Sequence, residues 1–268
     1  MVYADPVAPA LASGSFYAQR PFYLSPDKLE SDYAPVRFER ELRIFRSYCR
    51  AGRVLDVGCS TGAFLYQLRA LYPGDYSVVG TDVAGGPLDH AESRGLEVIR
   101  EPFLEFDFGQ TRFDAITFWA VMEHLFLPRQ FLSHAASLLK AGGLCFVLVP
   151  NLQSLAVRLL GPKYRYIMPD HVNYFDSITL GAFAGSESFF ELLALRSTHF
   201  NPVVLWQDFL APKQAVADLE RARLLKRTTG YKMNRFLKPA KWLYDGVERM
   251  LGRMKLADNL VAVLRRRV

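Results

Sequence analysis

Residues 53–62 read Arg53-Val-Leu-Asp-Val-Gly-Cys-Ser-Thr-Gly62, and this stretch decides the fold. Its three aliphatic residues after the arginine predict a buried strand, and Gly58 and Gly62 form a bend that leads into a helical pattern. In a parallel α/β sheet, this arrangement brings bare backbone N–H groups and a helix N-terminus up to a nucleotide-like ligand. Ser60 and Ala63 stand where a dinucleotide fingerprint needs glycine, and no lysine follows the second glycine as a phosphate loop requires.

Apolar segments and turn residues continue the α/β pattern along the chain. Strands are predicted at 54–57, 76–82, 96–100, 113–118, 144–149, 189–197 and 203–206, and helices at 33–49, from 63 onward, at 128–140 and at 177–183. The second strand ends in Asp82, which lies 20 residues past Gly62. A parallel fold places a carboxylate there against ribose hydroxyls, because its two oxygens accept both donors. The alternative is that Asp82 caps the helix that follows.

The acid in the first strand followed by Gly-x-x-x-Gly resembles motif I of the class I S-adenosylmethionine (SAM)-dependent methyltransferases, with a serine in place of their middle glycine. The run 54–151 resembles the small-molecule branch, which includes ubiquinone-biosynthesis O-methyltransferases and sugar and natural-product methyltransferases. The shared residues are Phe113-Asp114, Glu123-His124-Leu125, Pro128, the run 138–143 and Pro150-Asn151, extended by Asp170-His171 to Phe175. This resemblance implies a Rossmann-like, doubly wound α/β fold. Its seven-stranded, mostly parallel sheet would have an antiparallel last strand, an N-terminal cap and a helical C-terminal extension.

The resemblance also implies SAM as the methyl donor and S-adenosylhomocysteine (SAH) as the product. Asp56 and the glycine bend would hold the methionine part, Asp82 the ribose, and the loop 101–112 the adenine between apolar walls. The predicted cofactor-binding residues are Asp56, Gly58, Cys59, Ser60, Gly62, Asp82, Val83, Leu104 and Trp119. Which acid contacts the adenine stays open, and packing is the alternative role of Trp119.

Two histidines are candidates for a general base. The methyl group on a sulfonium needs an acceptor held in line, and an alcohol or phenol must also lose a proton. His124 and His171 fall in segments predicted to line the ligand edge of the sheet, and a histidine near its ordinary pKa suits this task. Glu123 is the third predicted catalytic residue, as an acceptor that orients a neighbouring donor. The other three histidines are assigned to structural or surface positions.

Some relatives bind a divalent metal through Glu-x-x-Glu-His and a distant histidine. In this sequence Ala120 replaces the first glutamate, so that Glu123, His124 and His171 remain. Three ligands are a small set for a divalent cation, and the sequence therefore predicts no metal site.

The positive charge is concentrated at the C-terminal end. Residues 203–268 carry 15 Lys and Arg against 6 Asp and Glu, whereas the rest of the chain carries 18 against 21. Nucleic acid is therefore disfavoured as a partner of the whole protein. Apolar residues at alternating steps of three and four from 240 to 264 predict a helix with a heptad seam and basic flanks. This helix would lie on the domain, on a second copy in a homodimer, or on an anionic membrane.

These patterns divide the chain into an N-terminal arm or cap with a lead-in helix (1–50), a SAM-binding domain (51–210) and a basic helical extension (211–268). The cysteines show no Cys-x-x-Cys pair, and neither a secretion signal nor a bilayer-spanning run is found. We therefore expect a cytoplasmic protein, peripheral to the inner membrane face in the membrane alternative.

The predicted function is SAM-dependent methylation of a small-molecule acceptor, at an oxygen of a sugar, quinone precursor or secondary metabolite. Two alternatives stay open. One is a non-catalytic protein of the same fold that serves as a partner or docks on a membrane, and the other is an RNA methyltransferase that uses the basic tail.

Overall fold

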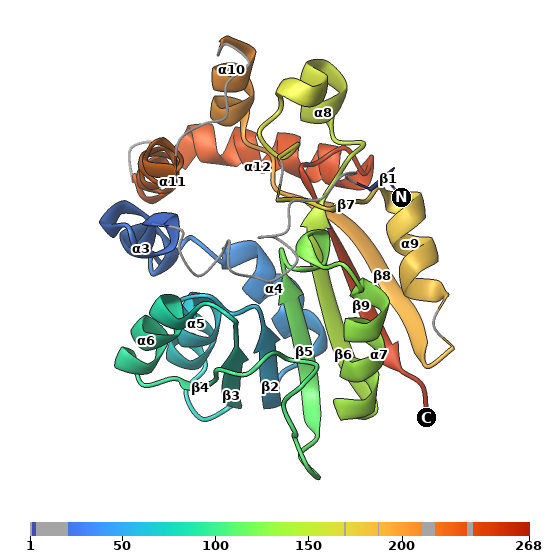
Figure 1. Ribbon diagram of the computed structural model, residues 1–268. Helices are drawn as coiled ribbons and strands as arrows, with labels where there is room; N and C mark the ends of the chain where they lie inside the picture. Colours follow the sequence, from blue (N-terminus) through green and yellow to red (C-terminus); the bar gives the residue numbers. More distant parts are fainter. Residues whose placement is uncertain (1, 4–20, 169, 187, 211–217, 235–237) are drawn as a thin grey trace.

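The computed structural model describes residues 2–3, 21–168, 170–186, 188–210, 218–234 and 238–268. Within these residues a seven-stranded sheet is flanked by helices on both faces (Figure 1). In spatial order the strands are β4 (Glu97–Ile99), β3 (Tyr76–Thr81), β2 (Gly52–Val57), β5 (Phe113–Trp119), β6 (Leu139–Pro150), β9 (Asn259–Arg266) and β8 (Phe190–Thr198). The predicted Rossmann-like sheet is confirmed.

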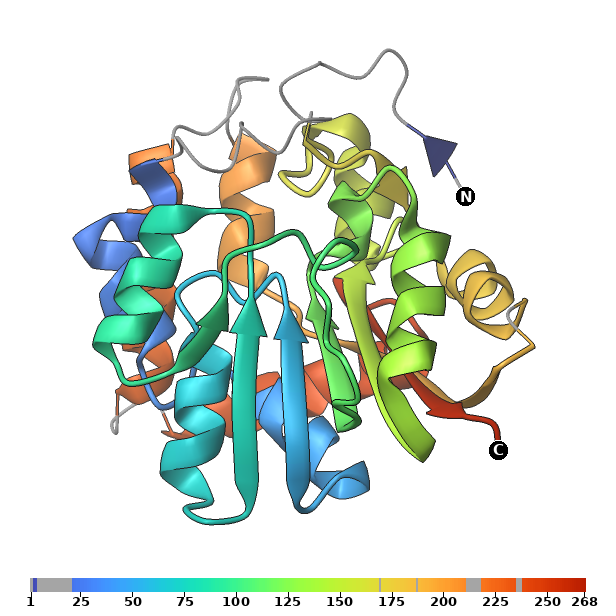
Figure 2. The same cartoon turned by 60° about the horizontal axis from the view of Figure 1, so that its bottom comes forward.

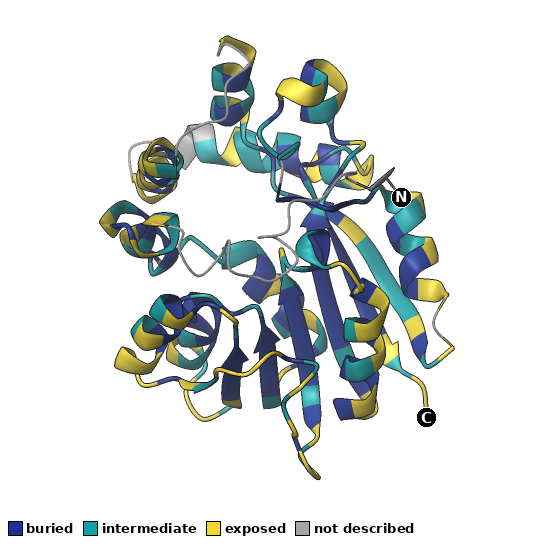
Figure 3. Cartoon of the chain, in the orientation of Figure 1, coloured by how far each residue is buried: buried dark blue, intermediate teal, exposed yellow. Residues whose placement is uncertain are grey.

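Successive residues of the central strands point into two cores, one on each face of the sheet. Val54 belongs to one core and its neighbour Leu55 to the other, and both are fully buried. The first core is covered by α4 (Glu39–Tyr48), α5 (Ala63–Leu71) and α6 (Gly85–Ser93), and the second by α7 (Pro128–Leu138) and α9 (Ser177–Gly185). Because helices cover both faces, these strands are nearly continuous apolar runs, drawn as buried in Figure 3.

The strands β2 to β6 run parallel, so their carboxyl ends gather along one edge of the sheet. The register pairs Val57 of β2 with Thr81 of β3, and Asp56 of β2 with Thr117 of β5. Ligands of open α/β sheets bind outside such an edge. This edge therefore positions the candidate site.

Several further elements lie beyond this edge, where both Figure 1 and Figure 2 place α8 and α10. They are η1 (Pro21–Leu24), α3 (Pro26–Asp32), η2 (Met122–His124), α8 (Leu155–Leu160), η3 (Gly161–Lys163), α10 (Pro202–Leu210) and α11 (Asp218–Met233). The helix α12 (Lys238–Arg253) contacts β8, and its Asp245 pairs with Arg40 of α4. A short strand β1 (Val2–Tyr3) also pairs antiparallel with β7 (Asn173–Tyr174). Residues 4–20 of the predicted N-terminal arm lie outside the described residues.

The seventh strand differs from the prediction in its place along the chain. The heptad seam predicted a helix through residue 264, but α12 ends at Arg253 and the chain then forms β9, antiparallel to both β6 and β8. The run 260–264 is apolar at every position and fully buried, which suits a strand covered on both faces. A short apolar run of this kind fits a helical spacing equally well, and the prediction of a helix there was wrong.

The segment 203–206, predicted as the seventh strand, is helical instead. Pro202 begins α10, and the amide oxygen of Asn201 accepts a hydrogen bond from the backbone N–H of Val204 (3.2 Å). Proline at the first helical position and asparagine before it are strong signals of a helix start. They override the strand preference of the two valines that follow.

Among the described residues, every helix is too short or too polar to cross a bilayer.

Candidate functional site

The glycine bend between β2 and α5 needs glycine at both of its predicted positions. Gly58 and Gly62 have φ angles of +73° and +72°, which disfavour any residue with a Cβ atom. A Cβ atom on Gly58 would lie 2.5 Å from Cγ2 of Val121, and one on Gly62 would lie 2.3 Å from Cδ1 of Leu96. The bend is therefore packed closely on its neighbours.

The backbone N–H groups of this bend are engaged within the protein, although the sequence led us to expect them bare. Gly58 and Cys59 both donate to the carbonyl oxygen of Thr81 (2.7 and 3.1 Å), and Gly62 donates to that of Cys59 (2.9 Å). Ser60, whose φ is +50°, donates to Oδ2 of Asp82 (2.8 Å). These four N–H groups are thus already satisfied within the protein.

Asp82 stands at the end of β3 and anchors the bend. Its Oδ1 accepts a hydrogen bond from the backbone N–H of Ala84 (3.0 Å), in addition to the bond from Ser60. Burial raises the pKa of Asp82, and these backbone donors lower it. A carboxylate has about four lone-pair positions, so acceptor capacity is left for two hydroxyl groups. Asp82 is not the N-cap of α6, because Ala84 holds that position and α6 has no side-chain cap hydrogen bond.

Asp56 and Cys59 are buried beneath the bend. Oδ1 of Asp56 accepts a hydrogen bond from Oγ1 of Thr117 (2.6 Å), and burial raises the pKa of Asp56 to about 7. The Cys59 thiol packs against Gly80, where a Cβ atom would come within 2.5 Å of the sulfur. Burial raises the pKa of Cys59, so this side chain acts in packing and not as a nucleophile.

The remaining predicted cofactor residues differ in exposure. Val83 is 51% exposed beside Asp82, whereas Leu104 is half-buried against the core. Trp119 packs edge-on against Phe64, with ring centroids 5.2 Å apart. This contact agrees with the alternative that Trp119 serves in packing. Its indole Nε1 is buried, as is Oγ of Ser60, and neither has a hydrogen-bond partner among the described residues. Such orphaned polar atoms fit a site completed by a polar ligand such as SAM.

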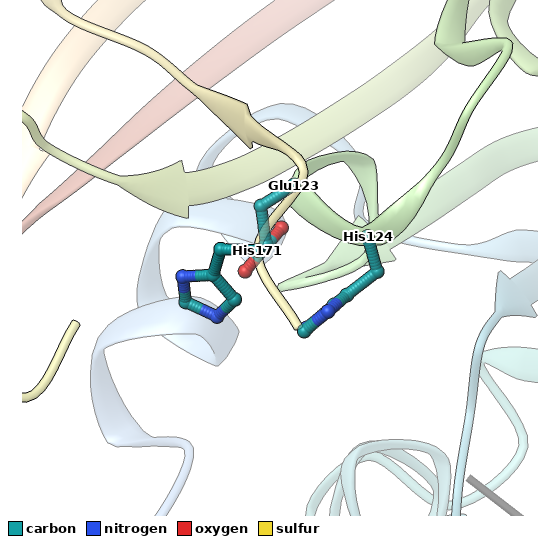
Figure 4. Close-up of side chains that lie close together, drawn as sticks. All are labelled: Glu123, His124 and His171. Carbon is teal, nitrogen blue, oxygen red and sulfur yellow. The ribbon is translucent and has the colours of Figure 1, made fainter. Parts of the chain in front are cut away.

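Glu123, His124 and His171 meet beyond the end of β5 (Figure 4). Glu123 and His124 belong to η2, and His171 lies two residues before β7. The two imidazole rings lie edge to face with their centroids 4.7 Å apart. One potential ligand atom from each of the three residues lies within 4.8 Å of the other two. The structure thus brings together all three residues predicted to be catalytic.

Backbone contacts hold this cluster in place. Nδ1 of His124 lies 2.7 Å from the carbonyl oxygen of Asp170, and Nδ1 of His171 lies 2.9 Å from that of Tyr166. A carbonyl oxygen accepts only, so each Nδ1 carries the proton and each neutral ring has its lone pair on Nε2. The amide nitrogen of Asn173 donates to the carbonyl oxygens of Met122 (3.0 Å) and Leu125 (2.5 Å). Only the place of this buried asparagine in the segment 170–175 linked it to the site before the structure was known.

Burial separates the roles of the three groups. It lowers the pKa of His171 to about 3, an effect to which neighbouring His124 also contributes, so this ring is neutral over the physiological range. Burial raises the pKa of Glu123 to about 8, and its Oε2 is buried without a hydrogen-bond partner among the described residues. His124 is the less buried of the two histidines. It is therefore better placed than His171 to exchange a proton with an acceptor.

The same donor set also fits a divalent cation. It comprises one carboxyl group and two imidazoles whose Nδ1 atoms are held by backbone carbonyls, the usual support of metal-binding histidines. A bound cation would also satisfy the orphaned oxygen of Glu123. Glu123, His124 and His171, which the sequence indicated were too few to bind a metal, thus lie close enough together to bind one ion.

The other three histidines lie in structural surroundings. The ring of His90 packs edge-on against Tyr33, and that of His134 packs edge-on against Phe103. Nε2 of His199 lies 3.3 Å from a carboxylate oxygen of Glu41.

This fold and site belong to a known class. A sequence profile of the methyltransferase-domain family matches residues 32–184, more than half of the chain, and the chain belongs to that family. This confirms the prediction of a methyltransferase that uses SAM as its methyl donor.

Among individual proteins, the chain is 26% identical over 197 residues to the ubiquinone biosynthesis O-methyltransferase of Glaesserella parasuis serovar 5. That match covers 65% of this chain and 82% of the relative. It is 30% identical over 149 residues to the ubiquinone biosynthesis O-methyltransferase of Caulobacter sp. strain K31, over 52% of this chain and 58% of the relative.

Solved structures share the fold. A SAM-dependent methyltransferase of Thermotoga maritima, described as a possible histamine N-methyltransferase, superposes with a TM-score of 0.57 at 15% identity, covering 92% of this chain and 98% of that one. The plantazolicin methyltransferase BpumL in complex with SAH superposes with a TM-score of 0.53 at 14% identity, covering 99% of this chain and 92% of that one.

Proposed function

We propose that this protein methylates an oxygen of a small-molecule acceptor, such as a phenolic quinone precursor, a sugar or a secondary metabolite. The cluster of Glu123, His124 and His171 beside the cofactor edge carries this proposal, because an oxygen acceptor must lose a proton. The named activity of the ubiquinone biosynthesis O-methyltransferases, to which the chain is similar, supports oxygen as the acceptor atom.

SAM supplies an electrophilic methyl group when bound, and the protein's own residues position it. Asp82 would accept the two ribose hydroxyls, while Asp56 and the bend from Gly58 to Gly62 would border the methionine part. Val83, Leu104 and Trp119 would form walls of the same site. Holding the acceptor in line is the larger task, and it contributes on the order of 7–11 kcal/mol in well-oriented cases.

His124 would take the proton of the acceptor hydroxyl at Nε2. The carbonyl of Asp170 supports this role, since it holds the Nδ1 proton and so fixes the tautomer. His171 would remain neutral and orient the acceptor or His124, because burial keeps its pKa far below neutral. Glu123, with its raised pKa, would donate or accept a hydrogen bond as a neutral carboxyl group.

The donor set supports a second candidate, in which a divalent cation held by Glu123, His124 and His171 would bind the acceptor oxygen. The cation would favour the deprotonated acceptor.

Calorimetric titration with SAH tests the cofactor part, and transfer of a labelled methyl group to phenols, sugars and amines tests the acceptor class. We expect SAH binding and transfer to a hydroxyl compound. Absence of SAH binding at high protein concentration would refute the enzyme proposal, and transfer to amines alone would refute oxygen as the acceptor.

The outer face of α12 supports the proposed contact of the C-terminal helix with a second copy of the chain. Trp242, Leu243 and Met250 on this helix are each more than half exposed, as is Met254 just after it. RNA methylation, the remaining alternative, would show as RNA binding that weakens steeply with salt.

A further inference from the structure

The helix α10 presents an apolar face to solvent. Trp206, Phe209 and Leu210 are each 62% exposed, and the rings of Trp206 and Phe209 stack with their centroids 5.9 Å apart. The opposite side of the helix is buried through Val204 and Asp208. Large apolar residues gathered on one face of a helix mark an interaction surface more often than scattered ones do.

A basic groove adjoins this face. Its cavity volume is about 210 Å³, and it lies between α10 and α11, lined by Arg165, Gln207, Glu220, Arg223, Leu224 and Arg227. Arg165 is neutralised by Asp208, with Nε of the arginine 3.0 Å from Oδ1 of the aspartate. The groove therefore owes its positive charge to Arg223 and Arg227, which outweigh Glu220.

The two surfaces form one firmly held unit. Buried Leu160, Val204 and Leu224 belong to a single apolar cluster that joins α8, α10 and α11. Through α8 this cluster also supports Leu159, which is 63% exposed. Figure 1 places α8 and α10 at the end of the molecule away from the sheet, and Figure 3 colours much of both as exposed. The apolar face is thus accessible to a broad, flat partner.

We infer that the α10–α11 face binds the surface of an anionic phospholipid bilayer. Aromatic rings suit the boundary between headgroups and acyl chains, and arginines beside them pair with lipid phosphates. Charge complementarity favours this occupant, because Arg223 and Arg227 outweigh Glu220 in the groove, whereas Lys226 of the same helix is paired with Asp27 and Glu30 of α3. The inner side of α11 reaches the site, since Arg221 contacts the sulfur of Met168 (3.8 Å) shortly before His171. Binding there would hold the acceptor side of the site near the membrane.

Flotation of the purified full-length protein with vesicles tests this inference. We expect binding to vesicles of phosphatidylcholine mixed with phosphatidylglycerol, weak binding to phosphatidylcholine alone, and loss of binding as salt is raised. The pairs Trp206→Ser with Phe209→Ser, and Arg223→Gln with Arg227→Gln, should each weaken binding on the order of tenfold or more.

A matched comparison lies on α12, the other helix that the sequence offered for contact with a membrane, whose outer face this inference leaves to a second copy of the chain. The set Trp242→Ser, Arg249→Gln and Arg253→Gln removes one exposed aromatic residue and two arginines there, and should leave vesicle binding unchanged. Point substitutions are needed, because deleting the C-terminal segment would remove β9, which joins β6 to β8 in the sheet. Melting temperature and SAH affinity, measured for every variant, check that the fold and cofactor site are intact.

Three results would overturn the inference. The first is a failure of the unmodified protein to bind the anionic vesicles. The second is loss of binding in the α12 set but not in the α10–α11 pairs. The third is a dimer by light scattering that the Trp206→Ser and Phe209→Ser pair converts to monomer, since a second copy would then occupy the face. None of these results depends on methyl transfer, so the inference and the proposed function fail separately.

Discussion

The substitution Asp82→Asn tests the cofactor site most directly. Asp82 accepts backbone hydrogen bonds from Ser60 on Oδ2 (2.8 Å) and from Ala84 on Oδ1 (3.0 Å), and each oxygen keeps one further lone pair for a ribose hydroxyl. Asparagine keeps the shape but replaces one oxygen with an NH₂ group. One backbone N–H then faces a donor, and one of the two ribose hydroxyls loses its acceptor.

The expected loss follows from these bonds. A hydrogen bond to a charged acceptor contributes about 1.5–3 kcal/mol, and a tenfold change in affinity corresponds to about 1.4 kcal/mol. SAH affinity should therefore fall roughly 10- to 100-fold. The lost backbone bond should also lower the free energy of unfolding by about 1–2 kcal/mol, since the burial that raises the pKa of Asp82 offsets part of its contribution.

Calorimetric titration with SAH and urea denaturation measure the two effects. The matched control is Asp89→Asn, whose side chain is 70% exposed and pairs with Arg100, so that little change is expected in either quantity. If Asp82→Asn bound SAH as tightly as the unmodified protein, the ribose role would be refuted. If its stability were also unchanged, the anchoring of the bend by this carboxylate would be refuted as well.

Three further outcomes are expected. Burial raises the pKa of Asp56 to about 7, so the stability that its carboxyl group contributes is full below about pH 4 and is lost as the pH rises to about 7. In urea denaturation, the free energy of unfolding of Asp56→Asn should therefore rise by roughly 2–4 kcal/mol relative to that of the unmodified protein across this interval. A difference between the two proteins that does not change with pH would contradict this. His124→Ala should lower turnover by roughly 10²–10⁴ while sparing SAH binding, and unchanged turnover at saturating substrate would end its assignment as the base. Burial raises the pKa of Glu123 to about 8, and a carboxyl group must be deprotonated to bind a metal ion. Mn²⁺ affinity measured by calorimetry should therefore rise between about pH 7 and pH 9 and be lost in Glu123→Gln. Absence of Mn²⁺ binding at both pH values in the unmodified protein would exclude the metal candidate.

The sequence predicts the parallel half of the sheet well, because strong local signals agree there. Gly58 and Gly62 stand where positive φ angles and close neighbours require them, and the strand before them is apolar on both faces. The predicted helix at 33–49 is shorter in the structure, where α4 begins at Glu39. Element ends depend on tertiary contacts, which a local pattern does not contain.

The antiparallel end of the sheet was harder to predict. The residues from Leu260 to Leu264 extend the three-and-four spacing of α12, and the spacing alone does not show that the helix has already ended. What decides the strand is its position between β6 and β8, which buries both faces of it. This information is carried by strands more than sixty residues away along the chain, so the local pattern could not supply it.

For the candidate site, sequence reasoning identified the residues but not the bonds that tune them. The place of Glu123 and His124 just after a strand of the sheet was sufficient to bring them to the ligand edge. Nothing in the sequence indicated that the N–H groups of the bend are satisfied by Thr81 and Asp82, or that Thr117 holds the carboxyl group of Asp56. Burial, which moves the pKa of His171 down and that of Glu123 up, is likewise a property of the assembled fold.

The position of His171 shows how the fold completes the cluster. The backbone N–H of Val172 donates to the carbonyl oxygen of Glu123 (2.8 Å), and Asn173 bonds to two further carbonyls on either side of it. These bonds tie the segment that carries His171 to η2, so neither histidine can shift without the other. The pairing of β1 with β7 adds a second layer of backbone bonds to the same segment. The rings are thus positioned by backbone contacts, which leaves their Nε2 atoms and the carboxyl group of Glu123 to carry the chemistry.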